Sequence, residues 1–351
     1  MEAEGLSKFY RVVVWLERWR IGVISAINRR VPTTPGSLSS TSVPSGEKLN
    51  DKVQRAFSNY YTDVSNDVDI QEANIKLTNE LSVNATNNLI SPQDMNQLLN
   101  TQLPPTLDDP LPVLGVRNNG NITTLTLGDI SMQLPSSRYQ ELLKSVTSED
   151  RERIVRLMLS YHPLNPSGGF FWSIDPLVYK WLNNGSPNII ECYASPFNYN
   201  SRTWCSLFES DKAYGSKGNF KTFVRSLNSP YLLVANPPYT EKVVSQCISE
   251  VTAYIARVPN SGAILVLSVW NDMKELEELK AKYPNDYLEM KPNHYSLYNH
   301  LNGTSFSLNG VNLVLFSIGN PSPFVAVKNV ATEVYNARIQ RELERTLTTI
   351  Q

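Results

Sequence analysis

From about residue 165 onward, short apolar runs of strand length alternate with amphipathic stretches of helical length. The apolar runs that predict strands are 188–192, 231–235, 263–269 and 311–318. The stretches that predict helices are 174–182, 241–255, 272–282 and 325–347. Strands that alternate with helices are typical of βαβ units on a parallel sheet, so this pattern predicts an α/β fold.

The beginning of the chain has a more polar pattern. Residues 8–30 predict an amphipathic helix with Trp15 and Trp19 one turn apart, and the segment near 31–48 has the Pro, Ser, Thr and Gly content of a linker. Arginines interrupt the apolar residues of this helix, so it does not resemble a signal peptide. We expect it to pack against the protein; contact with a membrane surface or a nucleic acid is the alternative.

Between these two regions the pattern changes twice. Residues 116–134 alternate around Asn119-Gly120, which predicts a β-hairpin, and residues 136–161 predict a helix. We therefore predict two parts, a mainly helical accessory region over 1–135 and an α/β domain over 136–351.

Composition narrows the class of protein. The net charge of −1 excludes a uniformly basic protein, although a local basic patch remains compatible with it. Three cysteines without CxxC spacing predict a reduced intracellular protein, nuclear or cytoplasmic, and three scattered histidines predict no metal site. The longest apolar runs have strand length, so we expect no transmembrane helix and no membrane partner.

The tetrapeptide Asn236-Pro237-Pro238-Tyr239 directly follows the predicted strand 231–235. Parallel sheets bind ligands at the carboxyl ends of their strands. Methylation of an adenine N6 amine, a weak nucleophile, needs an acceptor for each amine hydrogen, and the Asn236 side-chain oxygen and the Pro237 carbonyl oxygen can provide them. The two prolines fix the backbone, and the Tyr239 ring offers a face for stacking a base. The alternative is a Pro-Pro turn with an incidental aromatic residue.

Two further segments suit a nucleoside cofactor. Glu191 is expected at the tip of the predicted strand 188–192, and a loop of small residues that begins at Ala194-Ser195 follows it; a purely structural loop is the alternative. Such a loop allows the backbone to approach the methionine part of a ligand. Farther along, Glu209 or Asp211 is a candidate to bind ribose hydroxyls, and a solvated turn is the alternative.

Lys212, Lys217 and Lys221 lie in a stretch where basic residues outnumber acidic ones. Near an active site, such lysines are candidates to contact the phosphates of a nucleic acid. A solvated surface is the alternative reading of the same residues.

Three stretches together resemble the phosphorylated-CTD-interacting factor family, the cap-specific adenosine N6-methyltransferases. The stretches are Glu191-Cys192-Tyr193-Ala194-Ser195-Pro196-Phe197-Asn198, Tyr214-Gly215-Ser216-Lys217-Gly218 and Asn236-Pro237-Pro238-Tyr239. The resemblance extends over about residues 150–320 and includes Trp270 and His294-Tyr295.

This resemblance implies a Rossmann-like methyltransferase fold preceded by a helical region that helps to bind cofactor and RNA. It implies S-adenosylmethionine as the methyl donor and, as substrate, the 2′-O-methylated first transcribed adenosine of capped mRNA. The tetrapeptide takes the catalytic role. With the acidic candidate Asp211 added from the residues themselves, the expected cofactor-binding residues are Glu191, Ala194, Ser195, Pro196, Asn198, Asp211 and Asn236. The expected substrate-binding residues are Tyr239 and Trp270, together with Lys212, Lys217 and Lys221 from the basic stretch.

Two other functions remain as alternatives. The same tetrapeptide serves N6-adenine methyltransferases that act on DNA or on other RNA, although neither a Gly-rich cofactor loop nor a target-recognition domain is recognisable in the sequence. A catalytically inactive relative that binds RNA or protein is the alternative of another class, and the intact tetrapeptide argues against it. The sequence shows no WW module with paired tryptophans, so docking on the tail of RNA polymerase II by that route is not expected.

Overall fold

The computed structural model describes Tyr10, Val13, Val14 and the ranges 112–146, 151–162, 169–185, 188–238, 241–268, 273–308, 310–320 and 325–350. Tyr10, Val13 and Val14 are helical, as the pattern of 8–30 predicts. The rest of that helix and the linker near 31–48 lie outside the described residues, and so do Tyr239 and Trp270.

The chain divides into two compact units. The first comprises Met1–Arg117, Thr124–Met132 and Ser148–Pro166, and the second comprises Asn118–Thr123, Gln133–Thr147 and Ser167–Gln351. The domain boundary predicted at residue 135 stays a prediction.

A three-stranded sheet precedes the α/β part of the chain. Its strands, in the order β1-β2-β3, are β1 (Gly115–Asn119), β2 (Ile122–Leu127) and β3 (Ile130–Pro135). Gly120 and Gly128 connect the strands with φ of +61° and +56°, values that favour glycine. The predicted hairpin is confirmed, and a third strand joins it. Residues 112–135 are thus mostly strand. The prediction of a mainly helical region over 1–135 stays a prediction for the residues before 112 that the structure does not describe.

Two helices replace the single helix predicted over 136–161. They are α5 (Ser136–Lys144) and α6 (Arg151–Tyr161), and α5 ends at Ser145. The prediction of one continuous helix is therefore wrong. The sequence Ser145-Val146-Thr147-Ser148 explains the break, because Ser and Thr side chains compete for backbone hydrogen bonds and β-branched residues are restricted in a helix.

The second unit contains a six-stranded mixed sheet in the order β6-β5-β7-β8-β12-β9. Its strands are β5 (Ile189–Ala194), β6 (Trp204–Ser206), β7 (Leu232–Ala235), β8 (Gly262–Ser268), β9 (Tyr287–Met290) and β12 (Leu313–Gly319). The first four strands in the sheet order are parallel, and β12 is antiparallel to both of its neighbours. The α/β prediction is confirmed, whereas the wholly parallel sheet is corrected at β12.

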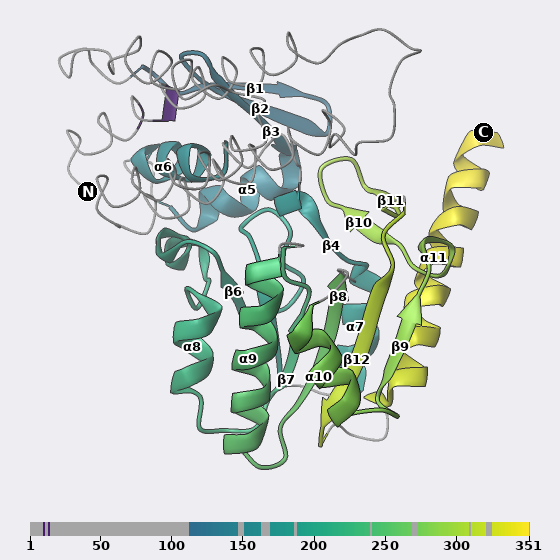
Figure 1. Ribbon diagram of the computed structural model, residues 1–351. Coiled ribbons are helices and arrows are strands. Elements are labelled where there is room, and N and C mark those ends of the chain that lie inside the picture. Colours follow the sequence, from purple (N-terminus) through teal and green to yellow (C-terminus); the bar gives the residue numbers. More distant parts are fainter. Residues whose placement is uncertain are drawn as a thin grey trace, which may run out of the picture. The chain divides into compact units, whose positions relative to one another are not determined.

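Helices cover both faces of this sheet (Figure 1). The helices α7 (Pro176–Gly185) and α11 (Val327–Ile350) pack on one face, together with alternate strand residues such as Val234. The helices α8 (Phe220–Ser226), α9 (Glu241–Arg257) and α10 (Lys274–Lys282) pack on the other face, against residues such as Leu233 and Ala235. Burial on both faces explains why the strands have continuous apolar sequences.

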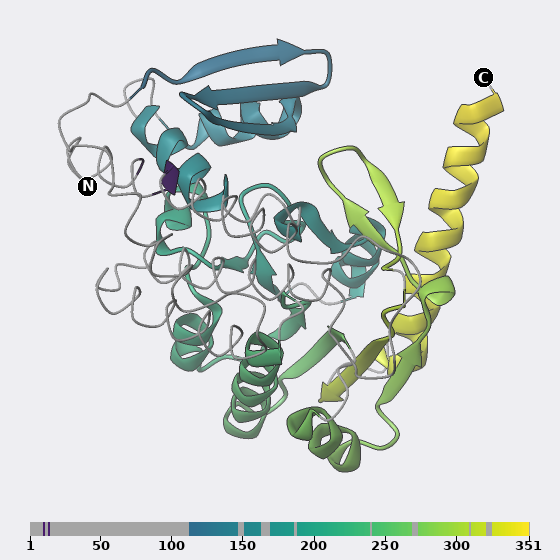
Figure 2. The same ribbon diagram turned by 45° about the horizontal axis from the view of Figure 1, so that its top comes forward.

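A small antiparallel sheet in the order β11-β10-β4 belongs to the same unit (Figure 2). Its strands are β4 (Trp172–Ile174), β10 (Leu297–Asn299) and β11 (Thr304–Phe306), and the short helix η2 (Gly169–Phe171) leads into β4. After β4, Asp175 begins α7: its carboxylate accepts a hydrogen bond from the Leu177 amide at 2.9 Å, and Pro176 suits the first helical position. Among the residues that the structure describes, no helix is long and apolar enough to cross a membrane.

Candidate active site at the carboxyl ends of β5 and β7

The order of the parallel strands creates a point at which the chain reverses its direction across the sheet. From β5 the chain passes to β6 on one side, and it then returns to β7 on the other side of β5. In open α/β sheets, ligands bind at the carboxyl ends of the strands at such a switch point. Ser195 follows β5 and Asn236 follows β7, so the structure brings the two predicted site segments to this same place.

The end of β5 is irregular. The register between β5 and β6 shifts between Glu191 and Ala194, as in a β-bulge. Tyr193 packs with the Phe220 ring, at a centroid distance of 5.2 Å, on the sheet face that also holds Cys192. Bulges are frequent beside active sites because they redirect the chain at the end of a strand. Ala194, half-buried, is the last strand residue before the loop.

A buried turn, Ser195–Asn198, begins that loop. The Asn198 side-chain oxygen accepts a hydrogen bond from the Ser195 amide at 2.7 Å and lies 3.0 Å from the Ser195 hydroxyl oxygen, whose one hydrogen is shared with a second acceptor. The same turn is fixed to the η2–β4 segment, because Ser195 donates to the Phe170 carbonyl and Asn198 donates to the Trp172 carbonyl, each at 2.7 Å. The side chains of Ser195, Pro196 and Asn198 are therefore buried in the turn, and the backbone is the part of the turn best suited to meet a ligand.

Glu191 lies inside β5 and not at its end. Its side chain is 2% exposed and accepts hydrogen bonds from the Asn200 amide at 2.6 Å and the Ser201 amide at 2.9 Å. The Tyr179 hydroxyl of α7 also donates to it. Burial raises the pKa of the Glu191 carboxyl in spite of these donors. The structure thus engages Glu191 in holding the loop after β5.

The tetrapeptide is described in part. Asn236 is half-buried, Pro237 is buried and Pro238 is exposed, while Tyr239 lies outside the described residues. Asn236 and Pro237 follow β7, whose four residues are all buried, so a rigid central strand positions them. Trp270, predicted on the substrate side, is likewise outside the described part.

The two acidic candidates after β6 differ sharply. Asp211 is completely buried in the short helix η3 (Glu209–Tyr214), so a ligand could reach it only after local movement. Glu209 is exposed; it pairs with Lys212 and accepts a hydrogen bond from the Asn219 amide at 3.1 Å. The contact with Lys212 lowers the pKa of Glu209. Of the pair, Glu209 is the carboxylate that is open to a ribose hydroxyl.

The three predicted lysines lie on the surface along this segment. Lys212, Lys217 and Lys221 are all exposed. The Lys217 amide donates to the Trp204 carbonyl of β6 at 2.8 Å, and Lys221 is in the first turn of α8. Since Lys212 is already paired with Glu209, Lys217 and Lys221 have more of their charge available for a phosphate.

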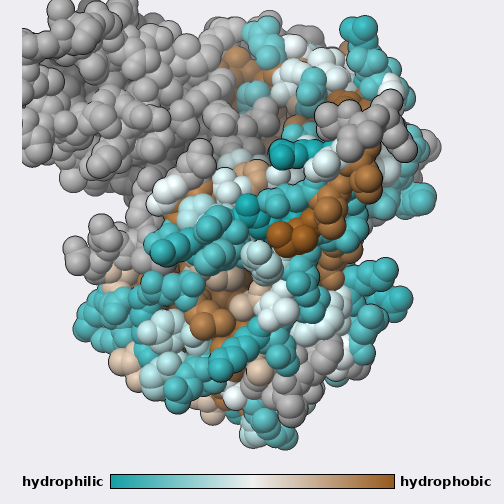
Figure 3. Space-filling model, turned by 90° about the vertical axis from the view of Figure 1, so that its right-hand side faces the viewer, coloured by the Kyte–Doolittle hydropathy of each residue, from teal (hydrophilic) through white to brown (hydrophobic). Residues whose placement is uncertain are grey.

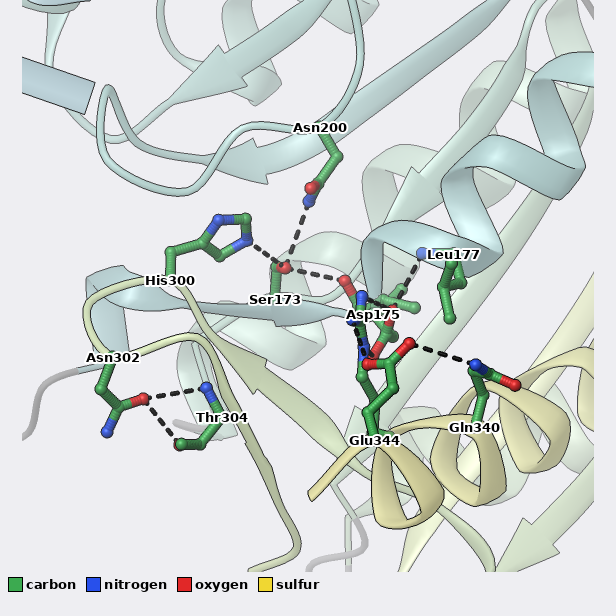
Figure 4. Close-up of polar contacts among 11 residues, drawn as sticks. Ser173, Asp175, Leu177, Asn200, His300, Asn302, Thr304, Gln340 and Glu344 are labelled. Atoms are coloured by element: carbon green, nitrogen blue, oxygen red, sulfur yellow. Dashed lines mark hydrogen bonds and ion pairs between the residues drawn. The ribbon is translucent and has the colours of Figure 1, made fainter. Parts of the chain in front are cut away.

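A polar chain beside the loop was not predicted from the sequence (Figure 4). The Ser173 hydroxyl of β4 lies 2.9 Å from the His300 ring and 3.1 Å from the Asn200 side-chain nitrogen. Burial, together with the charge of Arg138, lowers the pKa of His300 to about 3, so its ring is neutral near pH 7. The contributing residues are up to 127 positions apart in sequence, and this distance hides their proximity.

Aromatic stacking supports the same loop. The rings of Tyr199 and Trp204 are stacked at 4.9 Å with an interplanar angle of 2°, and the Arg138 guanidinium lies 4.3 Å from the centre of the Tyr199 ring. The ring contact and the cation contact both help to fix Tyr199 in place.

The chemistry of the other candidate ligands is limited. Cys192, Cys205 and Cys247 are buried, and burial raises the pKa of Cys205 and Cys247 to about 12. In the described part of the chain, no three His, Cys, Asp or Glu side chains are grouped as a metal site would require.

A family model matches residues 140–300, and its description is "Phosphorylated CTD interacting factor 1 WW domain". The match begins inside α5 and ends just after β10, so it spans the loop after β5, the tetrapeptide and the polar chain. Although the description names a WW domain, the matched residues of this chain include four parallel strands and the helices α7, α8, α9 and α10. Residues 140–300 are therefore similar to the phosphorylated CTD interacting factor 1 family.

Proposed function

We propose that this protein is an S-adenosylmethionine-dependent N6-adenosine methyltransferase whose substrate is mRNA, at the 2′-O-methylated adenosine next to the cap. The observation that most supports the proposal is the position of Asn236-Pro237-Pro238 directly after β7, at the switch point of the sheet. The match of residues 140–300 to the phosphorylated CTD interacting factor 1 family supports the cap-related substrate.

We further propose that the six-stranded sheet is a Rossmann-like methyltransferase fold. Two features support this assignment. The order in which the chain adds parallel strands to the sheet reverses between β5 and β7, and one antiparallel strand, β12, lies next to the last parallel strand, β8. The residues before 136 would then form the accessory region that helps to bind cofactor and RNA.

In the proposed reaction, the chain acts by positioning and by accepting hydrogen bonds. S-adenosylmethionine supplies an electrophilic methyl group when bound. The Asn236 Oδ1 atom accepts one hydrogen of the adenine amine and the Pro237 carbonyl accepts the other, which aligns the nitrogen lone pair with the methyl carbon. As the new N–C bond would form, the bond between the methyl carbon and the donor sulfur would break with its electron pair kept on sulfur, and the methylated amine would release one proton to water. Acceptors fixed before the reaction stabilise the charge that develops on nitrogen, and Tyr239 stacks on the base.

The residues near the switch point offer chemical groups that suit the parts of S-adenosylmethionine. The half-buried Ala194 and the turn Ser195–Asn198 present backbone groups at the end of β5, where the methionine part would lie. Glu209 is the proposed partner of the ribose hydroxyls, and Asp211 would take that role only if η3 moved. Glu191 acts on the donor through the loop that it holds.

The deciding experiment is methyl transfer from labelled donor to three oligonucleotides of the same sequence: capped RNA, uncapped RNA and DNA. The proposal expects label on capped RNA above the other two, at the N6 position. Equal label on uncapped RNA or DNA would favour an adenine methyltransferase without cap dependence. Donor binding with no label on any of the three would indicate an inactive binding protein.

A further inference from the structure

Asn200 joins several parts of the loop between β5 and β6. Its amide donates to Glu191 at 2.6 Å. Its side-chain nitrogen lies within hydrogen-bond distance of Ser173 Oγ (3.1 Å), Glu191 Oε1 (3.2 Å) and the Asn198 carbonyl (3.1 Å). The side-chain nitrogen has two hydrogens for these three acceptors, so at least one hydrogen is shared.

These hydrogen bonds connect three separate segments. Ser173 belongs to β4, Glu191 belongs to β5, and Asn198 closes the buried turn at the start of the loop. The turn is fixed at its beginning by the bonds of Ser195 and Asn198 to the η2–β4 segment. Asn200 fixes it at its far end, so the path of residues 195–201 depends on both attachments.

The same hydrogen bonds require the chemistry of an amide. Glu191 is buried, and a buried carboxylate needs donors to offset the loss of water. Asn200 supplies two of these donors, its backbone N–H and its side-chain NH2. An alanine would remove the side-chain donor, and an aspartate would place a second carboxylate beside the first.

We propose that Asn200 is a positioning residue for the methyl donor: by joining Glu191 to Ser173, it holds the loop after β5 in the conformation that binds S-adenosylmethionine. This inference rests on the proposed function and adds to it a residue that does not itself touch the reacting atoms.

The test compares full-length wild type with Asn200→Ala and with Asn302→Ala as a matched control. Asn302 is an exposed asparagine in another loop, and its side-chain oxygen accepts hydrogen bonds from the amide and the hydroxyl of Thr304. Calorimetry gives the donor Kd, and steady-state kinetics give KM for donor, KM for RNA and kcat. Asn200→Ala removes a hydrogen bond to the buried Glu191 carboxylate. It should therefore weaken the binding of S-adenosylmethionine by about tenfold to a hundredfold. At saturating donor, kcat and the RNA KM should stay within about threefold of wild type, and Asn302→Ala should match wild type.

A second variant tests an effect that a purely structural role of Asn200 does not predict. In Asn200→Asp, two carboxyl groups share one buried site, so the pKa of one of them should be raised and it should keep its proton to higher pH. The donor Kd of this variant should improve between pH 8 and pH 6, while that of wild type should not. The other titratable or charged groups around the site include Tyr179, Cys192, His300 and Arg138; burial raises the pKa values of Tyr179 and Cys192, and the pKa of His300, about 3, lies below this range.

The outcomes separate this inference from the proposed function. If wild type binds no donor, the proposed function fails and the inference fails with it. If wild type binds donor and folded Asn200→Ala binds it equally well, only the inference is overturned. If Asn200→Ala does not fold, Ser173→Ala decides, because it removes the β4 acceptor of Asn200 and should still weaken donor binding by a few-fold; an unchanged Kd in that variant overturns the inference.

Discussion

Asn236 and Glu191 show how differently two polar side chains at the same sheet edge are used. Asn236 is half-buried after the end of β7, whereas Glu191 is buried inside β5 and surrounded by donors from the chain itself. In the proposed mechanism the first contacts the substrate, and the second acts on the loop.

For Asn236, the expected effect concerns chemistry and not donor affinity. Asn236→Ala should reduce methyl transfer at least about a hundredfold, since it removes an acceptor aimed at the amine. The donor Kd, measured by calorimetry, should change by less than about threefold. Asn236→Asp should be milder, because a carboxylate oxygen can still accept the hydrogen bond. Turnover near that of wild type in Asn236→Ala would remove this residue from the proposed mechanism.

For Glu191, the expected effect is a change of stability with pH. The folded-state pKa of Glu191 is raised by burial, so its contribution to stability is fully present below the unfolded pKa and is lost as pH rises through the folded pKa. The free energy of unfolding of Glu191→Gln relative to wild type should therefore shift in favour of the variant between pH 4 and pH 7. Urea unfolding at both pH values measures it. A shift toward wild type would show that the donors around the carboxylate outweigh its burial.

The residues of the site were predictable from sequence to different degrees. The tetrapeptide could be found because it is short, contiguous and directly after an apolar strand. The polar chain could not be found, because Asn200 is 27 residues and His300 is 127 residues from Ser173. Nor could the sequence distinguish Glu209 from Asp211, since two residues in one turn differ in exposure only once the turn packs.

At the level of elements, the carboxyl-terminal helix α11 is held by both of its halves. Its first half packs on the sheet through Val327, Val330 and Val334. In the second half, Arg341 binds the buried carboxylate of Asp175 through Nε at 3.1 Å and Nη2 at 3.3 Å. Leu343 and Leu347, in the same half of α11, are 56% and 65% exposed and contribute little to packing. On the side of the molecule seen in Figure 3, hydrophobic residues lie in a band between hydrophilic ones. The ion pair is thus a main attachment of this half of the helix.

Arg341→Ala should therefore destabilise the protein by about 1–3 kcal/mol, because it leaves the Asp175 carboxylate buried without its cation. The partial exposure of Arg341 keeps the effect below that of a fully buried pair. Arg345→Ala, at an exposed position one turn farther along, should change stability by less than about 0.5 kcal/mol. Urea unfolding of the two variants provides the comparison, and equal effects would contradict the assigned role of the pair.

The direction of β12 illustrates what the pattern of elements could not predict. The apolar run at 311–318 predicted a strand, and the strand is present at Leu313–Gly319. Its antiparallel direction is invisible in the pattern, because a strand covered on both faces is apolar throughout in either direction. The strands β4, β6, β10 and β11 have three residues each, too few for a periodic pattern to emerge.

For the molecule as a whole, the net charge of −1 provides no overall electrostatic attraction to RNA. The proposed RNA binding therefore depends on local basic groups. Reversing Lys212, Lys217 and Lys221 to Glu should raise the KM for capped RNA and flatten its salt dependence, by a slope of about 0.7 for each phosphate that is no longer neutralised. Donor affinity should barely change. Reversal of Lys212 alone should have the smallest effect, since Glu209 already pairs with it.

The control for this measurement carries the same change of charge elsewhere. Lys274, Lys282 and Lys328 are exposed on α10 and α11. Their reversal should leave the salt slope closer to that of wild type. Steady-state kinetics at two salt concentrations distinguish the two sets, and identical slopes in both would assign the effect to overall charge and remove the three lysines from the RNA path.

Every cysteine of the chain is one of the three buried thiols Cys192, Cys205 and Cys247. With their pKa values raised by burial, almost none of these groups is thiolate at neutral pH, and the thiolate is the form that alkylating reagents attack. A maleimide should therefore leave the folded protein unmodified and add to all three thiols only after denaturation, as mass spectrometry can show. A single cysteine introduced by Thr222→Cys, at an exposed position of α8 next to Lys221, would then be the one site that takes a fluorescent dye, so that the arrival of RNA could be followed in real time without first removing any native cysteine.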